Sequence, residues 1–551
     1  MKTHLLAVSL VVGHVLAGWS QIEFTPENTA VVVPKDAKSR HRVVQFAAEE
    51  MTNFLSRTFG AAVPIVHAVD PQRSCIVLGS NDWSVAAGID TSKLPQEGFA
   101  IRTKGNAVYV AGVDANQNPR KNRGYYARAT LFGAYDFLER FVGCRFYFPG
   151  EFGEIVPRRT SFSVPATDFV SAPKFLERSI SSRVSMGLWP SATRDVPEAC
   201  WIESLRLRLQ TRPLPHCHGL RGFKFAQRFG ATHPEYFYMD ESGRRVTRDT
   251  EKRPYSENSQ MCQTSAIWDE IFRDARSYFR GEGPEVRGML VGTGKGRRPG
   301  WGSQAQGRAY YDVMPQDGLK FCHCPKCRAQ AGAGSQWATP IVWKGTAEVA
   351  RRLIDEGVPG TILQMAYGSH TAVPDFPIPT NVLVMVAQTG PWNVPFPERM
   401  AKERETIGAW VRKTGAKVFL WNYICRFGRP DPQGLPFGAP RCVGAYYKAM
   451  RDLITGSYLE SNSDRFLFNY MDYYIYGKGV YMTGGVLENC LVASNVVGRF
   501  SYTAGIYLDG AGTVVNCTVV GGTVTSTEQS GSFANVGVGI HIANSKGRVV
   551  N

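Results

Sequence analysis

Two acidic residues stand where carboxyl-group chemistry could take place. Asp317 follows an apolar segment, 310–314, that we expect to be a buried strand, and Glu460 ends another expected strand, 457–460. In proteins that alternate strands and helices, functional side chains lie at the carboxyl ends of the strands. Two carboxyl groups that flank a glycosidic bond can hydrolyse it, one as acid and the other as base or nucleophile. The alternatives are a plain Asp-Gly turn for Asp317 and a surface acid before a helix for Glu460.

Further side chains near the expected strand ends suit contacts with a sugar ring. Sugars present apolar faces edged by hydroxyl groups, so aromatic, amide and imidazole side chains favour their binding. The candidates are Tyr367, Gln388, Trp392, Trp421, Asn422, Tyr423, His216 and His218. Arg178, on the first expected strand of this region, could bind a uronate carboxylate. The alternatives are polar packing for the two histidines and an ion pair inside a barrel for Arg178.

Three closely spaced cysteines, Cys322, Cys324 and Cys327, follow Asp317. Two of them could form a disulfide while the third pairs elsewhere, and export from the cell favours this arrangement. Three thiolates together with His323 or a distant ligand could instead bind structural zinc. Free buried thiols are the third alternative. None of these makes the cysteines catalytic, and no cofactor other than the possible zinc ion is expected.

The segment 173–478 has the pattern of a TIM (β/α)8 barrel. Strands are expected at 176–182, 212–216, 310–314, 361–366, 381–387, 417–423 and 457–460, and helices at 267–279, 341–355, 397–413 and 443–454. Alternating strands and helices predict a parallel sheet with crossover helices. About eight such units over about 300 residues predict the barrel. The least regular part, 221–303, is expected to form long loops.

The segments on either side of this barrel differ from it in pattern. Residues 21–165 predict an α+β domain, with helices at 40–59 and 125–141 and strands at 74–79, 99–102 and 107–112. Residues 479–551 are rich in small and β-branched residues and repeat a motif, GGVLENC at 484–490 and GTVVNC at 512–517. Such repeats predict a fragment of a right-handed parallel β-helix. The expected fold class is therefore α/β with a small β-helix appended.

The composition and the first residues bear on location and partners. The 551 residues carry 63 Lys and Arg against 47 Asp and Glu, a net charge of +16, which favours acidic partners or serves solubility alone. Residues 1–20 combine Lys2, an apolar run and small residues, as in a secretory signal peptide. We therefore expect a secreted, periplasmic or cell-surface protein that meets polysaccharide rather than nucleic acid. No later apolar run is long enough to cross a bilayer.

Several motifs of other enzyme classes are missing from the sequence. It has no GxxxxGK[ST] phosphate loop, no HExxH zinc motif and no GxSxG nucleophile turn. These absences weigh against nucleotide hydrolysis, metalloprotease activity and the common esterases.

Five separated motifs resemble the domain of unknown function 4838 family. They are HPEYF at 233–237, QMCQTS at 260–265, QDGLKFCHCPKC at 316–327, FLWNY at 419–423 and SYLESNSDRFLFNYMDYYIYGK at 457–478. The stretch 123–157 also resembles the end of the N-terminal domain of bacterial α-glucuronidases and β-hexosaminidase-like enzymes. The family pattern usually has Asn directly before the Asp of its central motif, where Gln316 stands here.

The resemblance implies a secreted barrel of the glycoside hydrolase kind, and it adds Glu235, within HPEYF, as a third candidate acid. A cap residue is the alternative for Glu235. The sequence thus favours a hydrolase of glycosidic bonds in a polysaccharide that is neutral or acidic. A glycan-binding protein without catalysis and a surface adhesion protein that works through its β-helix are the alternatives.

Overall fold

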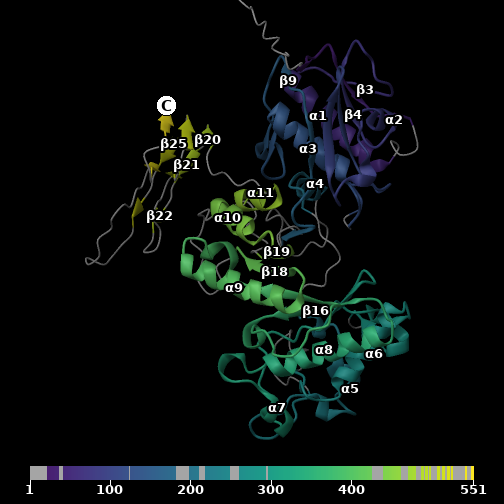
Figure 1. Cartoon of the computed structure of the whole chain (residues 1–551), viewed down its shortest axis with the longest axis vertical. Helices are drawn as coiled ribbons and strands as arrows, with labels where there is room; N and C mark the ends of the chain where they lie inside the picture. Colours follow the sequence, from purple (N-terminus) through teal and green to yellow (C-terminus); the bar gives the residue numbers. More distant parts are fainter. Residues whose placement is uncertain are drawn as a thin grey trace, which may run out of the picture. The chain divides into compact units, whose positions relative to one another are not determined.

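The computed structural model describes residues 21–35, 41–122, 125–180, 198–209, 218–247, 260–292, 296–424, 439–460 and 470–478, and short strands between 485 and 550. The expected signal peptide, the expected strand at 212–216 and His216 lie outside these residues. The chain forms two compact units, of which unit 1 comprises Met1–Phe146 and Gly150–Pro173. Unit 2 comprises Tyr147–Pro149 and Lys174–Asn551. Figure 1 shows the elements of both units.

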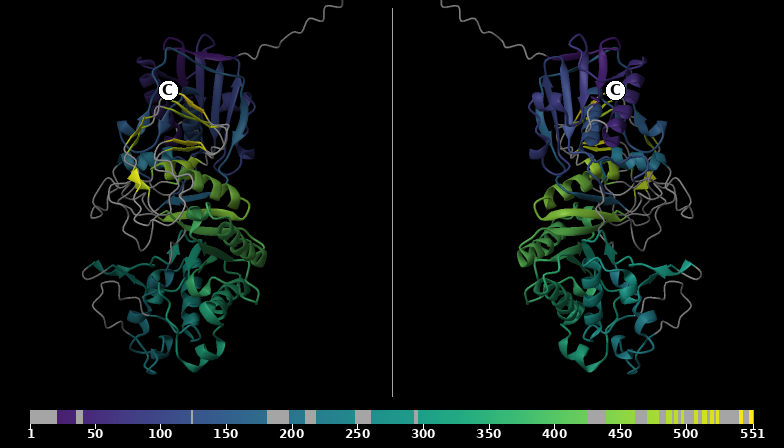
Figure 2. Two further views of the ribbon diagram at one scale, coloured as in Figure 1. Left: turned by 90° about the vertical axis from the view of Figure 1, so that its left-hand side faces the viewer. Right: turned by 90° about the vertical axis from the view of Figure 1, so that its right-hand side faces the viewer.

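Unit 1 is built on a six-stranded sheet. Its strands, in spatial order, are β10 (Asp168–Ser171), β5 (Phe99–Lys104), β6 (Ala107–Gly112), β4 (Ser74–Leu78), β2 (Thr29–Val32) and β3 (Ile65–Val66). Two helices that contact each other, α1 (Arg42–Phe59) and α3 (Ala129–Phe137), pack against this sheet (Figures 1 and 2). Helix α1 buries one apolar stripe and ends at Gly60, whose φ of 73° favours glycine. The expected helix at 125–141 starts later, at Ala129, and ends in a π-helical turn.

Unit 2 contains a curled seven-stranded sheet that forms a half-barrel. Its strands, in spatial order, are β11 (Glu177–Ile180), β19 (Ile454–Glu460), β18 (Val418–Tyr423), β17 (Val382–Ala387), β16 (Thr361–Ala366), β15 (Tyr310–Asp312) and β14 (Ala305–Gln306). All neighbouring pairs are parallel except β14 with β15. The last strand, β19, pairs with the first, β11, as the last and first strands of a (β/α)8 barrel do, and within the described residues β11 and β14 form the two edges of this sheet.

Five helices of unit 2 accompany this sheet. They are α6 (Ile267–Phe279), α8 (Thr339–Asp355), α9 (Pro397–Thr414), α10 (Pro440–Met450) and α11 (Tyr470–Lys478). One large apolar core includes side chains of α6, α8, α9 and α10 together with side chains of the strands. At its centre the rings of Trp343 and Trp410 lie 4.4 Å apart. The sheet is therefore anchored by its convex, helix-covered face.

The expected helix at 443–454 is wrong at its carboxyl end. Helix α10 ends at Met450, and Ile454 opens β19, where it pairs with Val418. Ile454 is fully buried, and its β-branched side chain suits a pleated strand better than the end of a helix. Strand β19 is consequently longer than the expected strand at 457–460.

The C-terminal repeats pair with one another in parallel. The strands β20 (Gly485–Glu488), β24 (Gly512–Val515) and β28 (Arg548–Val550) form one sheet. The strands β23 (Ile506–Leu508) and β27 (Ile540–Ile542) form a second pair. The two copies of the repeated motif, at 484–490 and 512–517, thus contain strands that pair with each other, and a β-helix remains our prediction for this region. No helix within the described ranges is both long enough and apolar enough to span a bilayer.

Candidate active site

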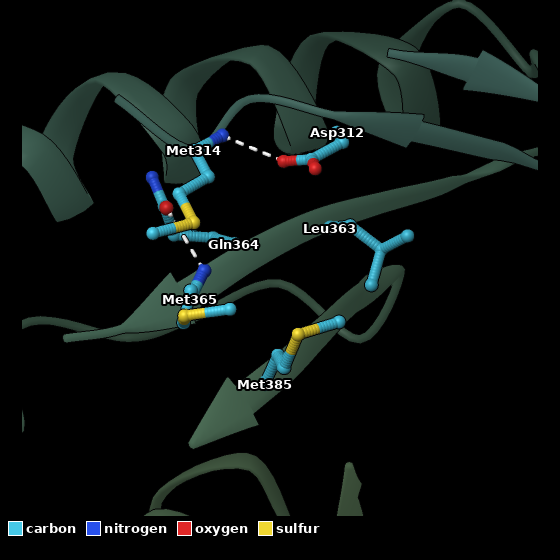
Figure 3. A pocket seen from close by; sticks show the side chains of 6 residues that line it. All are labelled: Asp312, Met314, Leu363, Gln364, Met365 and Met385. Atoms are coloured by element: carbon cyan, nitrogen blue, oxygen red, sulfur yellow. Dashed lines mark hydrogen bonds between the residues drawn. The ribbon is translucent and has the colours of Figure 1, made fainter. Parts of the chain in front are cut away.

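The inner face of the half-barrel is filled by apolar side chains beneath its carboxyl edge. Figure 3 shows the side chains of Asp312, Met314, Leu363, Gln364, Met365 and Met385, which surround a gap with no room for a water molecule. The buried Asp312 carboxylate accepts a hydrogen bond of 2.8 Å from the Met314 amide. A ligand of this half-barrel therefore has to bind above this layer, where the strands end.

Asp317 lies in the exposed turn that follows β15. Gly318 adopts a φ of 64°, and its amide donates a 3.0 Å hydrogen bond to Asp317 Oδ1. The Tyr367 hydroxyl, directly after β16, donates to the same oxygen at 3.4 Å. The Gln260 side-chain amide lies 3.5 Å from the Asp317 carbonyl oxygen. The turn is thus real, and it presents the Asp317 carboxylate to solvent at the edge of the sheet.

Glu460 is the last residue of β19, where it pairs with Tyr423 of β18. The Trp421 indole donates a 2.8 Å hydrogen bond to Glu460 Oε2. Burial raises the pKa of the Glu460 carboxyl, the Trp421 hydrogen bond and the charge of His218 lower it, and the negative charge of Asp317 raises it. The charges of Asp317 and His218 therefore both reach Glu460, and the three side chains face one region.

His218 is held against the end of β15 by two contacts of its own. Its ring Nδ1 lies 2.9 Å from the Pro315 carbonyl oxygen, and its backbone amide lies 3.3 Å from Met314 Sδ. The next residue, Gly219, has no space for a side chain, because a Cβ would lie 2.3 Å from the Asp312 carbonyl oxygen. The amide of Leu220 then donates to the Met314 carbonyl. This close packing fixes His218 beside the Asp317 turn.

The three consecutive candidates in β18 do not share one face. Trp421 and Tyr423 belong to the inner apolar group, and the Trp421 ring lies 4.2 Å from that of Tyr458. Asn422 is fully buried on the opposite face. Its amide donates to the Gln388 carbonyl at 3.2 Å and to the Tyr446 hydroxyl at 3.3 Å, and its oxygen accepts from Tyr447 at 3.0 Å. Asn422 therefore holds the sheet to α10, and we place only its two neighbours in the site.

Two further candidates follow β17. The half-buried Gln388 continues the ladder, because its amide donates to the Trp421 carbonyl at 2.9 Å. The half-buried Trp392 lies in a short 3-10 helix, Gly390–Asn393. The buried Glu403 holds this turn by accepting hydrogen bonds from the Gly390 amide at 3.2 Å and from the Asn393 side chain at 2.6 Å. Both candidates thus lie on the carboxyl edge of the sheet.

Two other candidates lie in different surroundings. Arg178 is buried on β11, where it donates to the carbonyl oxygens of Arg208, at 2.9 Å, and of Phe175. The guanidinium of Arg178 therefore binds backbone carbonyl oxygens, and not the carboxylate of a uronate that we expected it could bind. Glu235 is exposed in the 3-10 helix Pro234–Tyr236, and its charge acts on Tyr236 together with that of Glu270. No interaction of Glu235 with the Asp317 turn occurs among the described residues.

Comparisons with known proteins give only distant likenesses. No protein-family model matches the sequence, and no curated protein matches it. A glycoside hydrolase family 115 4-O-methyl-α-glucuronidase with specificity for decorated arabinogalactans is 14% identical over 83% of this chain and 57% of its own, with a TM-score of 0.42. A Flavobacterium johnsoniae chitobiase is 10% identical over 84% of this chain and 67% of its own, with a TM-score of 0.40.

A third structure, the β-N-acetylhexosaminidase of Bacteroides fragilis, is 10% identical over 83% of this chain and 89% of its own, with a TM-score of 0.38. This chain spans only 57% of the length of the glucuronidase. At these identities and TM-scores the likenesses by themselves assign no activity to the chain.

A cluster of four buried cysteines lies next to the Asp317 turn and could bind a metal ion. It comprises Cys262, Cys322, Cys324 and Cys327, whose sulfur atoms all lie within 4.8 Å of one another. All four are free thiols. The disulfide that we expected among Cys322, Cys324 and Cys327, because exported proteins often contain disulfides, is therefore wrong. Cys262 was missed as a partner because it is a single cysteine about 60 residues before the others, without the paired spacing that marks zinc sites.

Proposed function

We propose that this chain is an exported glycoside hydrolase that cleaves glycosidic bonds with Glu460 and Asp317 as its paired acids. The observation that carries the proposal is that Glu460, the last residue of β19, and Asp317, in the turn after β15, both lie at the carboxyl edge of the half-barrel. Glycosidases need two carboxyl groups whose surroundings separate their protonation states. Here the half-buried Glu460 has a raised pKa, whereas Asp317 lies exposed in its turn.

The different surroundings of Glu460 and Asp317 suit the two carboxyl groups to different catalytic roles. Burial raises the pKa of Glu460, which suits this residue to give a proton to the leaving oxygen as the glycosidic C–O bond breaks. Asp317 carries the negative charge that either accepts a proton from the attacking water or bonds to the anomeric carbon. The Tyr367 hydroxyl, which donates to Asp317 Oδ1, holds this carboxylate in place.

The same edge offers contacts that suit a sugar. The aromatic side chains of Trp421, Tyr423 and Tyr367 belong to the group on the inner face, and sugar rings stack on such surfaces. His218 adds a donor or acceptor beside Pro315. The net charge of +16 favours a polysaccharide that bears carboxylate or sulfate groups. We propose an acidic polysaccharide as the first substrate class to test.

We also propose that the chain belongs to the domain of unknown function 4838 family. Two of the motifs behind that resemblance, QMCQTS and QDGLKFCHCPKC, contribute the four cysteines of one cluster. Their contact in the structure supports the proposal that they are parts of one family pattern. The proposal includes removal of residues 1–20 on export. N-terminal sequencing of the exported protein tests that part.

A metal ion in the cysteine cluster would have no part in the chemistry that we propose. Paired-carboxylate hydrolysis of a glycosidic bond requires no cofactor. All four cysteines are buried, with exposed fractions of 3% or less, so a metal ion bound by them would have no open position for a substrate. We therefore propose that the cluster has a structural role.

The test is turnover on a panel of neutral, uronate-containing and sulfated oligosaccharides. We expect cleavage of at least one class, and a loss of about 10²–10⁴-fold in kcat for Asp317→Asn and for Glu460→Gln with the fold retained. Glu235→Gln is the matched control, because it removes an exposed carboxylate elsewhere in unit 2. Binding without turnover across the panel would instead identify a glycan-binding protein. Full activity of Asp317→Asn would remove this residue from the mechanism.

A further inference from the structure

The cysteine cluster joins two segments that are far apart in the sequence. Cys262 comes from the loop before α6, whereas Cys324 and Cys327 come from the beginning of α7 (Pro325–Gln330). Cys324 caps this helix by accepting a hydrogen bond of 3.4 Å from the Cys327 amide. No apolar layer separates the four sulfur atoms, since each lies within 4.8 Å of the other three.

The spacing of the sulfur atoms fits tetrahedral coordination. The Cys262 sulfur lies 3.7 Å from that of Cys324 and 3.7 Å from that of Cys327. Four sulfur ligands at about 2.3 Å from one zinc ion are separated by about 3.8 Å. A disulfide would bring two sulfur atoms to about 2.0 Å, far closer than these two separations. The spacing therefore favours one shared ion over any single bridge.

Polar groups around the cluster suit four thiolates. The Met239 amide lies 3.3 Å from the Cys322 sulfur, and the Thr264 hydroxyl lies 3.2 Å from the Cys327 sulfur. The Arg245 guanidinium lies 3.8 Å from the Cys322 sulfur. A zinc ion with four thiolates carries a net charge of −2, which these donors and this cation partly offset.

His323 is not needed as a ligand. Its Nε2 lies 3.8 Å from a carboxylate oxygen of Glu241, and its Nδ1 lies 3.2 Å from the Arg328 guanidinium. Both ring nitrogens thus have partners outside the cluster. The fourth position of the site belongs to Cys262.

We propose that Cys262, Cys322, Cys324 and Cys327 bind one structural zinc ion, and that this ion fixes the turn that carries Asp317. The turn ends only four residues before Cys322, and Gln260, two residues before Cys262, contacts the Asp317 carbonyl. The segment of Cys262 thus contacts the turn through Gln260, and the segment of Cys322 continues directly from the turn. This site adds to the proposed hydrolysis and does not depend on it.

The direct test is the metal content of the purified full chain, measured by inductively coupled plasma mass spectrometry. We expect one zinc ion per chain, released in step with the titration of four thiols by a mercurial reagent. Cys262→Ser should lose the ion, whereas Cys442→Ser, which removes a half-buried thiol in α10, should keep it. Iron in place of zinc, a bridge among the four cysteines or four free thiols without metal would each overturn the proposal.

Two further measurements cover the case in which Cys262→Ser does not fold. Cobalt exchanged into the wild-type chain should give the strong visible and near-ultraviolet bands of a tetrahedral tetrathiolate site, and their absence contradicts the site. Removal of the metal should speed tryptic cleavage after the exposed Lys320 several-fold, and unchanged cleavage contradicts the role of the ion in fixing the turn. Asp317→Asn should keep its zinc, so failure of the proposed hydrolysis and failure of the zinc site are distinguishable.

Discussion

The Trp421 indole donates a 2.8 Å hydrogen bond to the Glu460 carboxylate, from the neighbouring strand of the same sheet. This hydrogen bond stabilises the ionised carboxylate and so lowers the pKa that burial raises. The pair therefore sets the pH range in which Glu460 keeps the proton that an acid catalyst needs.

Trp421→Phe should shift the alkaline limb of the pH profile to higher pH. Without the indole donor, which stabilises the ionised carboxylate, the pKa of Glu460 rises further, so the protonated form persists to higher pH. The measurement is kcat against pH on the best substrate of the panel. Trp410→Phe is the control, because it removes an indole hydrogen bond, to Thr371, away from the site. A limb that stays in place or moves to lower pH would contradict Glu460 as the acid.

Asn422→Ala and Tyr423→Ala should separate stability from catalysis. Asn422→Ala deprives the buried Tyr447 hydroxyl of its acceptor, so we expect a loss of about 1–3 kcal/mol in the free energy of unfolding. The catalytic constants of the folded fraction should change little. Tyr423→Ala removes an aromatic surface from the inner face, so KM should rise several-fold with a smaller loss of stability. Urea unfolding and steady-state kinetics on both variants check this, and the reverse pattern would place Asn422 in the site.

Asp312→Asn should remove a dependence of stability on pH. Burial raises the pKa of Asp312 from 3.8 to about 7 in the folded protein. The folded state thus keeps a proton that the unfolded state loses near its ordinary pKa. The contribution of this group to stability is complete below that pKa, falls as the pH rises, by up to about 1.4 kcal/mol per pH unit, and is lost by about pH 7.

The measurement is the free energy of unfolding of both proteins between pH 4 and pH 8. The stability of Asp312→Asn relative to the wild type should increase across the window from 3.8 to about 7. Asp114 of unit 1 also has a pKa raised to about 7 by burial, but it is present in both proteins and its effect cancels in the difference. A difference that is independent of pH would show that Asp312 is ionised in the folded state.

A chain that ends at Lys478 should keep the glycan cleavage of the full chain. The two proposed acids and all the aromatic candidates precede that residue, and only Glu488, Asp509 and Glu528 supply carboxylates after it. Turnover per folded molecule is the quantity to compare, since the repeats can contribute to solubility. Loss of activity in a well-folded truncated chain would bring the adhesion hypothesis forward.

The strands of the half-barrel could be predicted closely because each carries a continuous apolar run bounded by turns. The expected strands at 361–366, 381–387 and 417–423 differ from β16, β17 and β18 by at most one residue at either end. The candidate pair of Asp317 and Glu460 could be predicted from these strands, because parallel strands bring their carboxyl ends to one edge of the sheet. Pairing across that edge, such as Trp421 with Glu460, depends on register, which a single sequence does not contain.

The position of Asn422 could also have been predicted from the sequence, whereas Cys262 and the start of β19 needed three-dimensional information. The period of two along a strand already separates Asn422 from Trp421 and Tyr423, and applying it would have excluded Asn422. Cys262 has no such signal, because its partners lie across a long irregular region. The boundary at Ile454 was misplaced because the apolar spacing of α10 continues into β19, and only the pairing with Val418 decides between them.

The pairing of β11 with β19 has a consequence for how the protein is made. Glu177 and Gly456 lie opposite each other in neighbouring strands, yet all the strands of this sheet other than β11 and β19 are synthesised between them. While the chain grows, the edge of β11 has no strand to pair with and is a template for wrong pairing with other chains. Contacts between such distant residues also slow folding. The half-barrel therefore needs protection until its last strand arrives, and we expect the β11 amides to be the last of the sheet to become protected from hydrogen exchange.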